Sequence, residues 1–401
     1  MSFSLLRRSV GFAALSLVVG AAAACSSSSS GTGSSSGTTG DVDGGVGDAA
    51  NPSKVGLGFK PSNIAFDGID ASALGDFVVD RANCNIRSEE KSVDCGDMSK
   101  LGFAIITQPG AGKIGVYVAR NIRIEPNTSL RVEGTFAIAI VALESFEILG
   151  GIDAGARQDY RSPGGFTNQG KEQFAGGGPG GGGAGSATNG GGGGSFCGIG
   201  GKSAALTGGT AASGGAAYGT PELIPLVGGS AGGSAALPFS GSGGGAVQLV
   251  AGRVFTLGAA AYVSAGGGGG TFVGAAGSQH GAGGGSGGAI LIEAPKTVLT
   301  GTLAANGGAG GAKEYGKDGT PDAVAATGDS LTNGSTGGSG SANENKDGVA
   351  ATFVDGDNAP GGGGGAGRIR VNNDEEKNIP LTGKLSPSAN LPCATGGPLT
   401  K

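Results

Sequence analysis

The chain has 401 residues, of which 92 are glycine and 14% are charged, and its formal net charge is −5. Glycine at this level is typical of fibrous or disordered chains, but the strict Gly-X-Y period of a collagen triple helix is absent. The small negative charge, without a basic cluster, argues against nucleic acid as a partner.

The N-terminus has the pattern of an export signal. Arg7 and Arg8 precede an apolar stretch, Val10 to Ala24, that is too short to span a membrane stably. The junction Ala22-Ala23-Ala24-Cys25 is similar to a bacterial lipobox, in which the cysteine is lipidated and becomes the new N-terminus. We therefore predict a signal peptide at residues 1–24 and a lipid anchor on Cys25. Ordinary signal-peptidase cleavage is the alternative.

Residues 25–51 are predicted to form a flexible tether, because Ser, Gly and Thr dominate them after Cys25. Ser26, rather than an aspartate, follows the cysteine. By analogy with enterobacterial sorting, this favours the outer membrane. The expected localisation is that of an outer-membrane lipoprotein, on the cell surface or the periplasmic face, with the membrane as its partner through the lipid.

Four further cysteines are expected to form two disulfides, as their even number in an exported chain suggests. Cys84 and Cys95 are the natural local pair, within a β-rich segment predicted at residues 52–114. Cys197 and Cys393 would then pair by elimination. A metal site is the alternative, but the chain has no CxxC and one histidine.

Five segments of residues 115–401 share one loose template of three short strands separated by turns. They begin at Gly115, Ile138, Gly245, Gly288 and Arg368, and a weaker coil is expected at Phe77 to Thr107. Such a repeat is typical of a β-solenoid, so we predict an all-β chain built as a short right-handed parallel β-helix. Alternation of apolar residues places Val116/Val118, Ile122/Ile124, Val247/Leu249 and Ile290/Ile292 on the inward face. An antiparallel sandwich is the alternative.

Long glycine-rich insertions separate the later repeats, at about residues 155–244, 266–287 and 307–365. Each follows a third strand and precedes the next first strand, so all three should leave from one edge of the stack. Ordering glycine costs backbone entropy, on the order of 1–2 kcal/mol per residue or more. Only extensive backbone hydrogen bonding offsets that cost. We expect a compact lobe with packing like that of polyglycine II, and disorder is the alternative.

The motifs that could carry catalysis are weak. Two G-x-S-x-G matches, Gly228–Gly232 and Gly284–Gly288, lie in low-complexity sequence, and the single histidine, His280, is expected to face solvent. Asp355 and Asp357 form a weak candidate calcium site. Outward positions of the repeats are sparse and mixed in charge, as in Arg123, Arg131, Gln248, Arg253, Glu293 and Lys296. No pair of catalytic carboxylates stands out, so we predict no catalytic residue, no cofactor and no enzymatic activity.

The ordered recurrence of "GGAILIEA", "GTLAANGG" and "GGAGRIRV" resembles a group of glycine-rich predicted lipoproteins abundant in myxobacteria. The resemblance covers about Phe77 to Asn373, and the repeat itself is similar to that of pectate-lyase-like parallel β-helices. Any likeness to PE-PGRS proteins lies in composition alone. The resemblance implies an envelope location and supplies no established activity.

These features together predict a structural or adhesive, non-catalytic role. The expected partners are polysaccharide or other envelope proteins, since smooth stacked faces and repeated loops suit binding. The alternative is a carbohydrate-active β-helix enzyme, either a polysaccharide lyase or a hydrolase.

Overall fold

The computed structural model describes residues 56–65, 73–157, 162–168, 173–235, 239–271, 280–374, 379–380 and 382–401. The predicted signal peptide, Cys25 and the tether lie outside the described residues. The described residues belong to one compact unit, Ala50–Lys401. They contain eighteen strands and one 3-10 helix, η1 (Met98–Lys100). Within these ranges, no helix has the length and apolar character needed to cross a bilayer.

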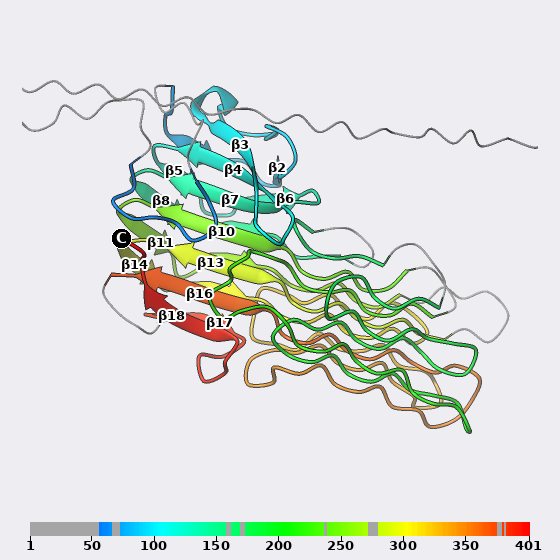
Figure 1. The fold of residues 1–401 in the computed structure, drawn as a ribbon. Helices are drawn as coiled ribbons and strands as arrows, with labels where there is room; N and C mark the ends of the chain where they lie inside the picture. The colour runs from blue at the N-terminus through cyan, green and yellow to red at the C-terminus, as the bar shows by residue number, and fades with distance from the viewer. Residues whose placement is uncertain are drawn as a thin grey trace, which may run out of the picture. The chain divides into compact units, whose positions relative to one another are not determined.

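The strands form three sheets (Figure 1). The first, in spatial order, contains β1 (Phe77–Val79), β5 (Ile122–Ile124), β8 (Ser145–Ile148), β11 (Val254–Leu257) and β14 (Lys296–Leu299). The second contains β18 (Ala394–Pro398), β16 (Arg368–Asn373), β13 (Ala289–Glu293), β10 (Ala246–Ala251), β7 (Ala137–Ala142), β4 (Lys113–Ala119) and β3 (Gly102–Thr107). The third contains β17 (Lys384–Ser386), β15 (Thr302–Ala304), β12 (Tyr262–Ser264), β9 (Gly151–Asp153), β6 (Ser129–Glu133) and β2 (Cys84–Arg87).

From β4 to β16, consecutive strands lie in the second, first and third sheets in turn. β4, β5 and β6 lie in different sheets, and β7, β8 and β9 return to the same sheets one position further along. The strand pairs are parallel, apart from the antiparallel pairing of β3 with β4 at one end. The antiparallel sandwich, which was the alternative, is therefore excluded. The weaker coil expected at Phe77 to Thr107 supplies β1 and β2 to the stack, whereas β3 runs the other way.

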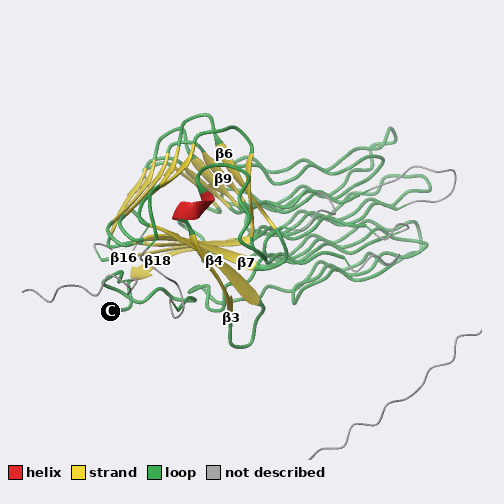
Figure 2. Cartoon of the chain, turned by 90° about the horizontal axis from the view of Figure 1, so that it is seen from above, coloured by secondary structure: helices red, strands yellow, loops and turns green. Residues whose placement is uncertain are grey.

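Like positions of successive repeats pair with one another. In the second sheet one ladder runs through Tyr117, Ile140, Leu249, Ile292 and Val371. These side chains share one buried cluster with residues of the other two sheets, so the three sheets surround a common interior (Figure 2). Burying each such apolar side chain stabilises the fold by about 1.5–3 kcal/mol.

The predicted inward residues are correct at Ile122/Ile124, Val247/Leu249 and Ile290/Ile292, all of which lie in this interior cluster. The prediction for Val116/Val118 is wrong, because the interior receives Tyr117 and Ala119 instead. Both faces of β4 are buried, so apolar residues stand at successive positions of this strand. The sequence pattern therefore does not show which residues face the interior.

The outer face of the second sheet is covered by two segments. Residues 56–65, here called the strap, place Leu57 and Ile64 in a second buried cluster together with Val116 and Val118. Residues 218–227 add Leu223 and Leu226 to the same cluster. This cover explains why outward side chains of the second sheet are apolar.

The glycine-rich tracts follow β9, β12 and β15 and return to β10, β13 and β16. They run side by side away from one edge of the stack in both views (Figures 1 and 2). The single exit edge and the ordering of the described tract residues agree with the prediction. We call this assembly the glycine lobe.

Backbone hydrogen bonds hold the glycine lobe together with a period of three residues. Within residues 190–196, N–H groups donate to residues 198–204, 281–284 and 180–183, and C=O groups accept from residues 215–218, 233 and 362–365. For example, Gly191 N–H donates to Gly281 O, and three residues later Gly194 N–H donates to Gly284 O of the same neighbouring segment. The segment is therefore hydrogen-bonded to neighbours on all sides. A β-strand, in contrast, bonds to neighbours in one plane only.

Close approach of backbones makes glycine obligatory at many lobe positions. A Cβ added at Gly283 would overlap the carbonyl oxygen of Gly192, and one added at Gly193 would overlap that of Gly363. Backbone atoms cannot rotate out of the way as a side chain can. The composition of the tracts thus follows from the spacing of the chains.

Two disulfides join the predicted pairs, Cys84 to Cys95 and Cys197 to Cys393. The second bridge spans 196 residues and links the glycine lobe to the C-terminal segment. A cross-link that closes so long a loop removes much entropy from the unfolded chain.

We expect Gly283→Ala to lower the unfolding free energy by at least about 1–3 kcal/mol, the usual cost of overpacking, because the new methyl group meets backbone. Gly112→Ala is the matched control, since nothing lies within 4 Å of its added Cβ. Thermal unfolding of both variants measures the difference. Equal melting temperatures would contradict the close packing of the glycine lobe.

Candidate functional site

A polar groove of about 1110 Å³ runs over the outer face of the third sheet. Its strands alternate apolar residues inward with polar residues outward, so Asn85 and Arg87 of β2 and Arg131 and Glu133 of β6 face the groove. Unlike the second sheet, this face has neither the strap nor residues 218–227 over it. The local pattern of β2 and β6 is therefore the ordinary one for a sheet with one wet face.

Parallel register arranges these side chains in rows along the stack. One row is Asn85, Arg131 and Asp153, and a second is Arg87 and Glu133. A third row is Ser129, Gly151 and Tyr262. Each row brings together residues that are far apart in the sequence.

Tyr262 lies across the neighbouring strand. A Cβ added at Gly151 would overlap its ring, so the absence of a side chain there makes room for the aromatic plane. Burial, with a smaller contribution from Asp153, raises the pKa of Tyr262. Its hydroxyl therefore keeps its proton and remains a hydrogen-bond donor at neutral pH.

A carboxylate–arginine cluster adjoins the tyrosine. Arg131 Nη1 lies 2.5 Å from Asp153 Oδ2, and Arg157 Nη2 lies 3.3 Å from the same oxygen. The N–H of Gly155 donates to the other carboxylate oxygen, Oδ1, at 2.9 Å. Asp153 is thus fully engaged by donors and serves to orient Arg131 along the groove.

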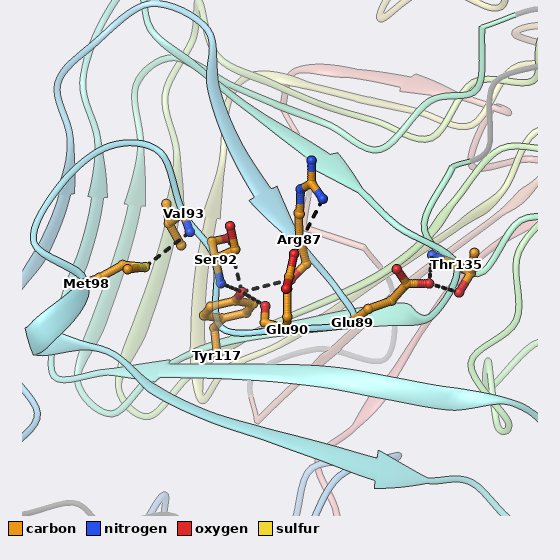
Figure 3. Close-up of polar contacts among 8 residues, drawn as sticks. All are labelled: Arg87, Glu89, Glu90, Ser92, Val93, Met98, Tyr117 and Thr135. Carbon is orange, nitrogen blue, oxygen red and sulfur yellow. Dashed lines mark hydrogen bonds and ion pairs between the residues drawn. The ribbon is translucent and has the colours of Figure 1, made fainter.

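The end of the groove at β2 is built by the turn that follows this strand (Figure 3). Arg87 pairs with Glu90 at 3.4 Å, and Glu89 accepts hydrogen bonds from the backbone N–H and the hydroxyl of Thr135. The bonds to Thr135 fasten this turn to the chain between β6 and β7.

Tyr117 supports the same turn from inside the stack (Figure 3). Its hydroxyl accepts from Ser92 N–H at 2.9 Å and lies 2.6 Å from the carbonyl oxygen of Glu90. Burial, the largest cause, raises the pKa of Tyr117 to about 12, and the charge of Glu90 acts in the same direction. Tyr117 is a structural residue, because it faces the interior rather than the groove.

Several residues singled out in the sequence lie away from the groove. His280 is buried, not exposed as predicted, because it bridges two segments of the glycine lobe: Ala359 N–H donates to Nδ1 at 2.9 Å, and Nε2 lies 2.9 Å from Ala187 O. Ser286, the serine of the second G-x-S-x-G match, accepts a hydrogen bond from Ser230 N–H at 2.9 Å, whereas His280 bonds to Ala359 and Ala187, so the structure does not pair this serine with the histidine. Asp355 and Asp357 are exposed, and their role as a calcium site stays a prediction.

Gln248 and Glu293 point outward from their sheet, as predicted, yet both are buried under the strap. Glu293 accepts from Ser62 Oγ at 2.6 Å, Gln248 Nε2 at 2.6 Å and Asn372 Nδ2 at 3.0 Å. This carboxylate therefore fixes the strap to the sheet and does not meet solvent.

One cluster of three potential metal ligands occurs among the described residues, formed by Cys84, Asp94 and Cys95. Both sulfurs are consumed by the disulfide, so they cannot act as thiolate ligands.

Sequence reasoning missed Asp153, Glu133 and Tyr262 as groove residues. Each is the first or last residue of a strand of three to five residues. A polar residue at such a position cannot be distinguished by sequence from a residue of the adjoining turn. Aligning the third strands of the repeats would have placed Gly151 against Tyr262.

Comparison of the chain with known families, curated proteins and solved structures found no match.

We expect Tyr117→Phe to reduce the loss of unfolding free energy that occurs as the pH rises above 10. An unfolded tyrosine titrates near pH 10, while the folded-state pKa of Tyr117 is about 12. The stabilisation from the raised pKa is thus complete below pH 10 and is lost as pH rises through 12. Denaturant titrations from pH 8 to 12 should show a smaller loss for Tyr117→Phe than for the wild type. Tyr315→Phe, at an exposed tyrosine, should retain the wild-type slope, and identical slopes for all three proteins would refute the assignment.

Proposed function

We propose that the protein is an exported lipoprotein, anchored through Cys25 in the outer membrane, that binds a neutral polysaccharide along the polar groove without cleaving it. The observation that carries the binding role is the ring of Tyr262 laid across Gly151 beside the Arg131–Asp153 pair. The anchor and the location rest on the N-terminal sequence alone.

We infer further that the three sheets are the faces of a right-handed parallel β-solenoid and that the glycine lobe is of polyglycine II type. Cyclic use of the sheets and parallel pairing of like positions support the first inference. Bonding in all directions with a three-residue period supports the second. The solenoid provides the straight, repetitive face that an extended polymer needs.

The chemistry of the groove suits a sugar ring. A pyranose has an apolar C–H face and a rim of hydroxyl groups, so it packs on an aromatic ring while its rim exchanges hydrogen bonds. Tyr262 supplies the ring, Arg131 supplies donors, and Glu133 supplies an acceptor in the adjoining row. Rows that run along the stack present these groups to successive sugars of one chain.

The charge of the groove favours a neutral chain. Arg87, Arg131 and Arg157 are balanced by Glu89, Glu133 and Asp153, and the central pair is already joined. A polyanion or polycation would meet equal attraction and repulsion, whereas neutral hydroxyls can bond to either sign. Binding should consequently depend little on salt.

The alternative function is a carbohydrate-active enzyme, and the three carboxylates of the groove are the observation in its favour. Asp153 is held by two arginines and a backbone N–H, which suits orientation rather than proton transfer. We therefore favour binding.

We expect Tyr262→Ala to weaken retention on neutral polysaccharide roughly tenfold, because the platform for the sugar face is lost. Tyr315→Ala removes an exposed tyrosine of the glycine lobe and is the matched control. Affinity electrophoresis with a panel of neutral and acidic polysaccharides gives the dissociation constants. Unchanged retention in Tyr262→Ala, or a preference for acidic chains, would contradict the proposal.

The same panel separates binding from catalysis. Retention without new reducing or unsaturated ends supports the binding protein, and release of such ends supports the enzyme.

Lipidation has its own test. Mass spectrometry of the N-terminus from native membranes should show a mature chain that begins at acylated Cys25, and Cys25→Ser should move the protein to the soluble fraction. An unmodified Cys25 would refute the anchor.

A further inference from the structure

A second cavity, of about 490 Å³, lies where the glycine lobe meets the second sheet. It is distinct from the polar groove and shares none of its residues. Its walls come from the turn between β3 and β4, the start of β7, two glycine-rich segments and residues 226–227. This volume is within the range of small-molecule sites.

Apolar side chains form one wall of the cavity, beside the polar residues Gln108, Lys113, Thr135 and Thr167. Phe136 and Phe166 are half-buried rings, and Leu226 and Val227 supply aliphatic surface. Glycine backbone at residues 164–165 and 177–178 completes the wall without side chains. Partly open aromatic surface in a concave site is a feature of ligand pockets rather than of ordinary surface.

The apolar wall is held in a fixed position. Gln108 is buried and bonds twice to the backbone of Leu226: its Nε2 donates to Leu226 O at 2.9 Å, and its Oε1 accepts from Leu226 N–H at 2.7 Å. Gly178 adopts a positive φ of 95°, and a Cβ there would clash with the ring of Phe166. A pre-formed wall lowers the entropy cost of binding.

One cation stands at the mouth of the cavity. Lys113 Nζ lies 5.4 Å from the centre of the Phe136 ring. Within the described part of the chain, this ammonium has no carboxylate within ion-pair distance. Its charge is therefore available to a ligand above the aromatic wall.

We propose that this cavity binds a small organic anion with a flat aromatic or acyl body. The body packs between Phe136, Phe166 and Val227, and its carboxylate or sulfonate pairs with Lys113. The site is independent of polysaccharide binding and uses other residues.

The test uses two dyes that differ in charge, the anionic anilinonaphthalene sulfonate and the uncharged N-phenylnaphthylamine. Fluorescence titration of the folded protein should give saturable binding of both, with a tighter constant for the anion. Lys113→Gln, at an exposed position, should weaken the anion about two- to fivefold, the range of an exposed ion pair, and leave the neutral dye unchanged. Val227→Trp should fill the cavity and abolish both.

Controls separate this site from the groove and from misfolding. Tyr262→Ala should bind both dyes like the wild type, and each variant should unfold cooperatively at a temperature near that of the wild type. Loss of saturable binding in the wild type overturns the proposal. So does equal weakening of both dyes by Lys113→Gln, or unchanged binding in a folded Val227→Trp.

Discussion

The backbone hydrogen bond between chain segments at equivalent positions is the interaction on which the whole molecule depends. In the sheets it sets parallel register, so that Ile140 meets Leu249 and Leu249 meets Ile292. In the glycine lobe it takes the place of a continuous hydrophobic core, because glycine runs such as residues 190–194 and 361–365 have no side chains to pack. A net contribution of about 0.5–1.5 kcal/mol per bond is comparable with the backbone entropy lost per residue. The lobe is therefore ordered only where nearly every residue finds a partner and both ends of each tract are already fixed by the stack.

Stacking also creates both candidate binding sites. The groove exists because parallel register turns single outward residues of short strands into rows, such as Asn85, Arg131 and Asp153. The cavity at the base of the glycine lobe exists because tracts leave beside the turn that precedes β7, where flat glycine backbone meets Phe136. The first site is polar and balanced in charge, and the second is apolar with one cation. Their difference in chemistry follows from their walls, which are strand faces in one case and tract backbone in the other.

The covered outer face of the second sheet shows why alternation of apolar and polar residues does not always predict which side chains are buried. β4 has apolar residues in both alternating sets, since Tyr117 enters the interior while Val116 and Val118 meet the strap. Glu293 and Gln248 look like exposed polar positions in the sequence, yet they anchor the strap through Ser62 and each other. The strap thus decides the environment of Glu293, which lies 231 positions after Ser62 in the sequence.

By itself, the sequence determined the three-strand repeat, the edge from which the tracts leave, the two disulfide pairs and most of the inward residues. These features depend on local periodicity and on the order of strands and insertions, which the sequence contains directly. Only the tertiary structure decided the environments of Val116, His280 and Glu293, and it alone showed the ring of Tyr262 lying over Gly151. Such environments depend on which other segment packs against a residue, as the strap does on Val116 and Ala359 does on His280, and local periodicity does not specify that segment.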